Sequence, residues 1–121
     1  MKVVSVFSDI GVPIPSTAPA ATDHLIMYYG PSPMTPSYTQ AGRKDCGAVS
    51  GIKAVAVPGA ASGAAATLYD VPISSLLPAG SVGSYDFAFT LVDSAGNEGD
   101  FSPIVTEAIT VPPRLGQPVV L

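Results

Sequence analysis

The sequence contains few charged residues. Asp, Glu, Lys and Arg make up 12% of its 121 residues, whereas soluble domains carry about 25%. A surface with so few charges is expected where a neighbouring subunit covers it, or where Ser, Thr, Gly and Pro keep it hydrated instead. Both explanations remain open, and the first indicates a protein that assembles with others.

Basic residues are the scarcer of the two charged classes. The chain has five Lys and Arg against nine Asp and Glu, which gives a net charge of −4. The largest basic cluster is the dipeptide Arg43-Lys44. Nucleic acids and anionic membrane surfaces are both bound through clusters of basic side chains. The composition therefore predicts no nucleic-acid partner and no membrane partner.

The residues that carry most enzyme chemistry are also scarce, because the chain has one cysteine and one histidine. A single cysteine excludes an intrachain disulfide. In the one catalytic hypothesis available, the basic residues before Cys46 lower the pKa of its thiol and His24 acts as the base. We interpret the stretch around Cys46 as a polar loop, and no motif surrounds either residue. We therefore favour a half-buried thiol and an exposed imidazole, and expect no enzyme activity and no cofactor.

Two kinds of long apolar segment are missing. The N-terminal run of strand-forming residues breaks at Asp9, well short of the apolar core of a signal peptide, and no run reaches the length of a transmembrane helix. We therefore expect the chain to be made and folded in a reducing compartment.

One loop gathers oxygen ligands that suggest calcium. It contains Asp93, Asn97, Glu98 and Asp100. The helix-flanked calcium loop requires an oxygen ligand where Ala95 stands, and no later Glu closes the site. We interpret the segment as a turn held by hydrogen bonds from an Asp side chain to its own backbone, and expect no metal site.

Strands are what the sequence does contain. Its 12 glycines and 13 prolines leave no window with helical periodicity. Pro72 favours an edge position or a strand end for residues 67–73. Residues 60–66 read as a small-residue loop or a single turn, and the Pro-rich residues 12–22 and 30–42 as extended surface segments. The predicted strands cover residues 3–7, 25–29, 50–57, 67–73, 85–93 and 101–111.

The clearest strand is residues 85–93, in which Tyr85, Phe87, Phe89 and Leu91 alternate with other residues. A period of two places these four side chains on one buried face. The turn-rich residues 94–99 then connect this strand to residues 101–111, so the sequence predicts a hairpin.

Residues 77–102 resemble the end of a fibronectin type III domain, over about a fifth of the chain. The residues that carry the resemblance are Leu77, Pro78, Gly80, Tyr85, Phe87, Phe89, Leu91, Asp93, Gly96, Asn97, Ser102 and the following Pro103. The resemblance implies an all-β, two-sheet antiparallel sandwich of the fibronectin type III or immunoglobulin-like kind, with about seven short strands and Pro-rich loops. It also implies that Tyr85, with Leu77, forms a structural tyrosine corner, and that residues 25–30 are the family's third strand.

We predict a single sandwich domain over residues 1–111 and an extended C-terminal arm over residues 112–121. The candidate partner contacts are Tyr28, Tyr38, Pro118, Val119, Val120 and Leu121. Residues 3–7 and 118–121 are candidates for strand exchange with a neighbour.

These features favour a non-enzymatic structural protein of a multi-subunit assembly. By analogy with the fold's use in bacteriophages, we expect a virion decoration, cement, spike or tail module, made in the host cytoplasm. Its partners would be capsid or tail subunits or further copies of the same chain. The alternative is an extracellular carbohydrate-binding or adhesion module of a secreted protein, with a glycan as ligand.

Overall fold

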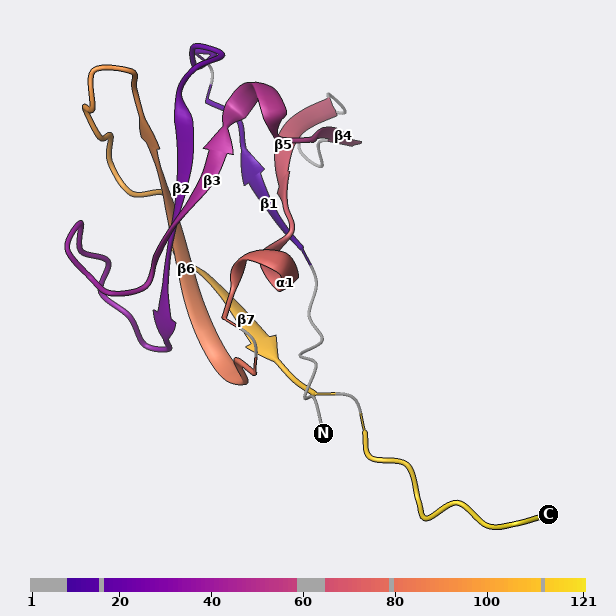
Figure 1. Ribbon diagram of the computed structural model, residues 1–121. Coiled ribbons are helices and arrows are strands. Elements are labelled where there is room, and N and C mark those ends of the chain that lie inside the picture. The colour runs from indigo at the N-terminus through magenta and orange to yellow at the C-terminus, as the bar shows by residue number, and fades with distance from the viewer. Residues whose placement is uncertain (1–8, 16, 59–64, 79, 112) are drawn as a thin grey trace.

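Two antiparallel β-sheets face each other in the computed structural model, which describes residues 9–15, 17–58, 65–78, 80–111 and 113–121 (Figure 1). The predicted all-β, two-sheet antiparallel sandwich is confirmed. The three-stranded sheet has the order β1 (Ile10–Pro13), β5 (Ala65–Val71), β4 (Ala54–Pro58). The four-stranded sheet has the order β3 (Arg43–Ala48), β2 (His24–Pro31), β6 (Gly83–Val92), β7 (Val105–Ile109).

The core lies between the two sheets and is built by alternate residues of the strands. Strand β2 contributes Leu25 and Met27, and β6 contributes Phe87 and Phe89. Met27 lies opposite Phe89 in the ladder, so the two largest strands bury a continuous row of side chains. Burial of each such side chain contributes about 1.5–3 kcal/mol. The opposite sheet completes the core with Ile10, Val12, Tyr69 and Val71.

The central pair β2 and β6 was predicted from its pattern, with shifted ends. Strand β2 continues past the expected break at residue 30 and ends at Pro31, opposite Tyr85. A proline is tolerated there because the end of a strand does not need its missing N–H.

Two strands lie where we predicted none. Strand β1 falls in and before the Pro-rich residues 12–22, and its Ile10 and Val12 face the core while Gly11 and Pro13 are exposed. Strand β3 includes Cys46, which corrects our interpretation of that stretch as a polar loop. Its residues have no apolar alternation, and the strand forms because its backbone pairs with β2.

The chain from residue 49 to residue 76 contains more turns than predicted. The expected strand over residues 50–57 begins only at Ala54, because Val49–Gly51 form a 3₁₀ turn. Strand β5 begins at Ala65, inside the expected small-residue loop, and ends at Val71. Pro72 therefore follows the strand end, as predicted, and the short helix α1 (Ile73–Leu76) comes next. The alternative edge position is wrong, since β5 is the middle strand of its sheet. The predicted strand over residues 3–7 lies outside the described residues.

The predicted hairpin is confirmed, since β6 pairs with β7 from Gly83 opposite Ile109 to Phe87 opposite Val105. Strand β7 begins four residues later than predicted. The chain before it runs beside β6 without regular pairing, with the Gly99 amide bonded to the Leu91 carbonyl at 2.9 Å and the Ser102 amide to the Phe89 carbonyl at 2.8 Å. Leu77, which precedes the hairpin, is buried in the core. The Tyr85 ring packs against the core near the start of β6, with its centroid 6.4 Å from that of Phe87. The hydroxyl bond of the tyrosine corner stays a prediction.

Candidate interaction surfaces

Two loops cover the outer face of the four-stranded sheet. Residues 32–42 join β2 to β3, and residues 93–104 join β6 to β7 (Figure 1). The first loop returns to the sheet at Gly42, whose carbonyl accepts a hydrogen bond of 3.0 Å from the Tyr29 amide. A Cβ at residue 42 would lie 2.0 Å from the Tyr29 carbonyl oxygen. Only glycine fits this approach, so it closes the loop onto the sheet.

Aromatic rings join the two loops to each other. Tyr38 stacks on Phe101 with ring centroids 4.4 Å apart, and its hydroxyl donates to the Gly99 carbonyl at 3.0 Å. The Tyr28 ring of β2 packs edge-on against Phe101, with ring centroids 5.0 Å apart. The two loops therefore form one layer over β2 and β6.

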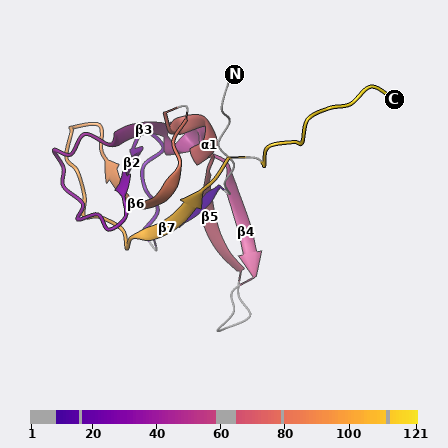
Figure 2. The ribbon, with the colours of Figure 1, turned by 90° about the horizontal axis from the view of Figure 1, so that it is seen from below.

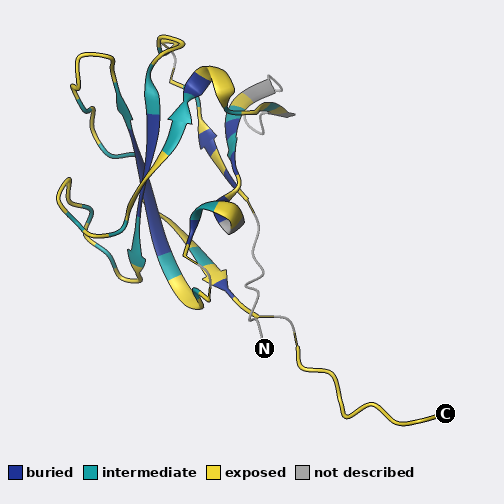
Figure 3. Ribbon diagram, in the orientation of Figure 1, coloured by how far each residue is buried: buried dark blue, intermediate teal, exposed yellow. Residues whose placement is uncertain are grey.

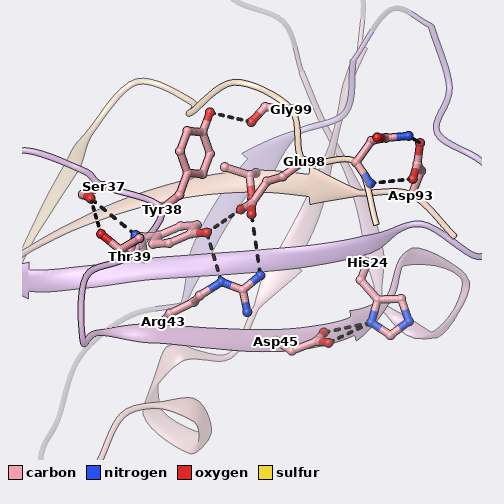
Figure 4. Close-up of polar contacts among 12 residues, drawn as sticks. His24, Ser37, Tyr38, Thr39, Arg43, Asp45, Asp93, Glu98 and Gly99 are labelled. Carbon is pink, nitrogen blue, oxygen red and sulfur yellow. Dashed lines mark hydrogen bonds and ion pairs between the residues drawn. The ribbon is translucent and has the colours of Figure 1, made fainter. Parts of the chain in front are cut away.

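The carboxylate of Glu98 is the centre of a hydrogen-bonded cluster under this layer (Figure 4). It accepts hydrogen bonds from the hydroxyls of Tyr28 and, at 2.6 Å, Thr90. Arg43 Nη2 lies 3.7 Å from Glu98 Oε1, and Arg43 Nε donates to the Tyr28 hydroxyl at 3.0 Å. Desolvation opposes the charge, but the bonds from Thr90 and Tyr28 and the charge of Arg43 outweigh it and lower the pKa of Glu98. The cluster satisfies its own polar groups and stabilises the covered face.

Our expectation that Tyr28 contacts a partner is wrong, because the residue is fully buried. Its ring is enclosed by Phe101, Tyr38 and the Arg43 guanidinium, which lies 5.7 Å from the ring centroid. Tyr38 remains 46% exposed and is available at the surface.

Asp86 is a buried carboxylate that the sequence did not reveal. The alternation of β6 predicted burial only for the face that carries Phe87 and Phe89, yet residues 86–90 are buried on both faces. Asp86 accepts hydrogen bonds from the Thr106 hydroxyl at 2.6 Å and the Met34 amide at 2.9 Å. The bond from Thr106, aided by the Met34 amide and opposed by desolvation, lowers the pKa of Asp86. A lone Asp within an apolar strand was the available signal.

The loop with calcium-type residues is a hydrogen-bonded turn, as we interpreted it. Asp93 Oδ1 accepts from the amides of Ala95 and Asn97, both at 2.9 Å. Glu98 points away from Asp93 toward the sheet (Figure 4). Within the described residues, no group of His, Cys, Asp and Glu is arranged to hold a metal ion.

Cys46 and His24 do not form a nucleophile and base pair in this arrangement. The thiol is half-buried, and its desolvation, followed by the charge of Asp45, raises the pKa of Cys46 to about 11. The hypothesis that basic neighbours lower this pKa is therefore wrong. His24 Nδ1 instead lies 2.9 Å from Asp45 Oδ2 across the β2–β3 pair.

The C-terminal residues 113–121 carry exposed apolar side chains away from the sandwich (Figures 1 and 3). Leu115 is 88% exposed, Val119 77%, Val120 101% and Leu121 113%. Pro118 is exposed as well, so the predicted contact residues at this end lie at the surface. Among the candidate residues, the structure therefore separates a buried Tyr28 from an exposed Tyr38 and an exposed arm.

The fold and these surfaces define an all-β sandwich with one covered sheet and an exposed apolar arm. Comparison of the chain with protein-family models, curated proteins and solved structures gives no match. In the described part of the chain, no helix is long and apolar enough to span a membrane.

Proposed function

We propose that this chain is a non-enzymatic structural protein that binds neighbouring subunits of a larger assembly through its C-terminal arm. The observation that carries the proposal is the exposure of Leu115, Val119, Val120 and Leu121 on a segment without strand or helix. Monomeric soluble proteins rarely expose contiguous apolar side chains unless a partner covers them. The low charge of the whole chain supports the same conclusion.

The strand order supports an immunoglobulin-like relationship. In that fold, one sheet has strands A, B, E and D, and the other has C, F and G with extra strands next to C. The order β1-β5-β4 corresponds to B-E-D, and β3-β2-β6-β7 to C′-C-F-G. Tyr85, near the start of β6, then takes the place of the corner tyrosine of strand F.

By analogy with phage proteins of this fold, the assembly is a virion, and the chain is its decoration, cement, spike or tail module. The partners are then capsid or tail proteins, and the place of synthesis is the host cytoplasm. The raised pKa of Cys46 and the His24–Asp45 pair support a role without catalysis.

The test removes the arm and leaves the sandwich. A chain without residues 117–121 should shift from large assemblies to small species when lysates of the producing cells are fractionated by sedimentation. Its melting temperature should stay unchanged, because these residues are exposed. A full-length variant with Val119, Val120 and Leu121 replaced by Ser separates apolar contact from length. An unchanged distribution for both variants would overturn the proposal.

A second candidate is an extracellular carbohydrate-binding or adhesion module. A hollow of about 280 Å³ beside loop 93–104 is lined by Tyr69, Asp100 and Phe101 among others. An apolar lining can cover one face of a sugar, and the exposed Asp100 carboxylate can accept hydrogen bonds from its hydroxyls. Binding of the purified chain on a glycan array, lost in Asp100→Ala, would favour this candidate over the first.

A further inference from the structure

The hairpin of β4 and β5 extends beyond the core of the sandwich (Figure 2). Ala54 lies opposite Tyr69, and Ala56 lies opposite Thr67, in the ladder of this hairpin. Tyr69 is buried, but Ala54, Ala56 and Thr67 are exposed although they share its side of the sheet. No charged residue occurs between Lys53 and Asp70. The hairpin is therefore an uncharged projection, and the exposed side chains described on this side of it are small.

Strand β4 is at the edge of its sheet, and the direction of its backbone groups follows from one hydrogen bond. The Asp70 amide donates to the Lys53 carbonyl at 2.8 Å. In an antiparallel pair the residues alternate between bonding inward and facing away. Lys53 and Val55 therefore bond toward β5, and the N–H and C=O groups of Ala54 and Ala56 face the open edge.

The other sheet edges have features that oppose pairing with a further strand. Charged residues and prolines are the usual protection of an edge strand. Strand β3 carries Arg43, Lys44 and Asp45, and β7 carries Glu107. Strands β1 (Ile10–Pro13) and β4 (Ala54–Pro58) both lack charged residues and both end in a proline. On the open edge of β1 only Gly11 offers an N–H, because the next outward residue is Pro13, whereas β4 offers the N–H groups of Ala54 and Ala56 before Pro58.

We propose that β4 is a self-association site, at which two copies of this chain pair their β4 strands antiparallel about a two-fold axis at Val55. In this register Ala54 faces the partner's Ala56, and Ala56 faces the partner's Ala54. Each facing pair exchanges two N–H···O=C hydrogen bonds, so four bonds join the strands. The result is one continuous sheet of six strands, β1-β5-β4 followed by the same three strands of the second copy.

Charge and size favour a second copy as the occupant of this edge. Two chains of net charge −4 repel each other, and the repulsion is smallest where neither surface carries a charge. The Ala54 and Ala56 side chains are small enough to let the strands approach, and Val55 faces the partner's Val55 as a β-branched cross-strand pair. A two-fold contact of this kind uses the same surface on both subunits and closes at the dimer.

This inference goes beyond the proposed function, because it names a partner and a surface that do not involve the arm. The β4 dimer needs no residue after Val71 for its new hydrogen bonds. Removing residues 117–121 should therefore leave the dimer intact, so the failure of either proposal can be told from that of the other.

The test is the solution mass of the purified chain and two Lys variants, measured by size-exclusion chromatography with light scattering. The unmodified chain should approach twice its 12.2 kDa mass as its concentration rises. Ala56→Lys places a charge on the edge and should weaken dimerisation by roughly tenfold or more, equivalent to about 1.4 kcal/mol. Thr67→Lys is the matched control, since it adds the same exposed charge directly opposite Ala56 but away from the edge, and should remain dimeric.

Amide hydrogen exchange gives a second readout that does not depend on a variant. The amides of Ala54 and Ala56 should exchange more slowly as the chain concentration rises, while melting curves confirm that both Lys variants are folded. A monomer at every concentration would overturn the proposal. So would a dimer that persists in Ala56→Lys, that is lost equally in Thr67→Lys, or that disappears when residues 117–121 are removed.

Discussion

The two sheets of the sandwich differ in how much of their surface the chain itself covers. The four-stranded sheet is covered by its own loops, and the charged groups beneath them, Asp86 and Glu98, are paired within the chain. The three-stranded sheet ends in a projecting hairpin without charge, and the arm adds exposed apolar side chains. An uncharged stretch, residues 54–69, therefore lies in this hairpin, and the arm carries one charged side chain, Arg114. The hairpin and the arm are where we place the contacts.

The largest expected effect is in the core beneath the covered sheet. Phe87→Ala should lower the free energy of unfolding by about 3–5 kcal/mol, because it removes a fully buried ring and leaves a cavity. Val105 lies opposite Phe87 in the ladder and is 40% exposed. Val105→Ala is therefore the control and should cost much less in urea unfolding. Equal losses of unfolding free energy would mean that the core around Phe87 is packed no better than the exposed strand at Val105.

The closure of loop 32–42 can be broken at one glycine. Gly42→Ala should cost about 1–3 kcal/mol, because the added Cβ clashes with the Tyr29 backbone, which cannot move without disturbing β2. Gly51→Ala has open space around its Cβ and serves as the control. Thermal unfolding followed by circular dichroism measures both, and a neutral Gly42→Ala would show that the loop is not held at this point.

The hydrogen bonds of the covered face depend on Glu98. Glu98→Ala leaves the hydroxyls of Tyr28 and Thr90 without their acceptor, which should cost about 1–3 kcal/mol in chemical denaturation. Asp100→Ala removes an exposed carboxylate from the same loop and should change stability by less than about 0.5 kcal/mol. If both variants behave alike, the cluster does not stabilise the covered face.

The pH dependence of stability should reflect the two hydrogen-bonded carboxylates of the covered face, Glu98 and Asp86. The pKa values of Glu98 and Asp86 are lower in the folded chain than their ordinary values of 4.5 and 3.8. Their stabilisation is therefore complete above these ordinary values and is lost as the pH falls through the lower folded values. Melting temperature should fall below about pH 4.5, and the fall should be shallower in Glu98→Ala. A fall of the same steepness in that variant would assign the effect to other groups.

The sequence predicted the longer apolar strands, and missed two others: β1, whose alternation covers four residues and runs into prolines, and β3, which is formed by pairing alone. Residues of β6 and β7 carry enough apolar alternation to place the hairpin. Strand β3 contains Arg43, Lys44 and Asp45 in succession, and only its ladder with β2 makes it a strand. Such pairing depends on residues distant in sequence, so local patterns could not reveal it.

The same dependence on residues distant in sequence explains which candidate contact residues could be predicted correctly. The exposed arm follows directly from composition, since its prolines and terminal valines have no neighbouring strand. The burial of Tyr28 does not, because it depends on Phe101, which is 73 positions further along and reaches Tyr28 only through the crossing of loop 93–104. The Glu98 cluster was hidden for the same reason, since its four members come from β2, β3, β6 and a loop.

The position at which the arm leaves the sandwich decides which end of the molecule would face away from a surface bound by the arm. The arm leaves at the end of β7, and the turn around Asp93 lies at the opposite end of the sandwich (Figure 1). A sandwich anchored by its arm would hold that turn outward, away from the surface to which it is attached. A peptide inserted between Ser94 and Gly96 would then be displayed to the surroundings without disturbing either the arm or the β4 edge.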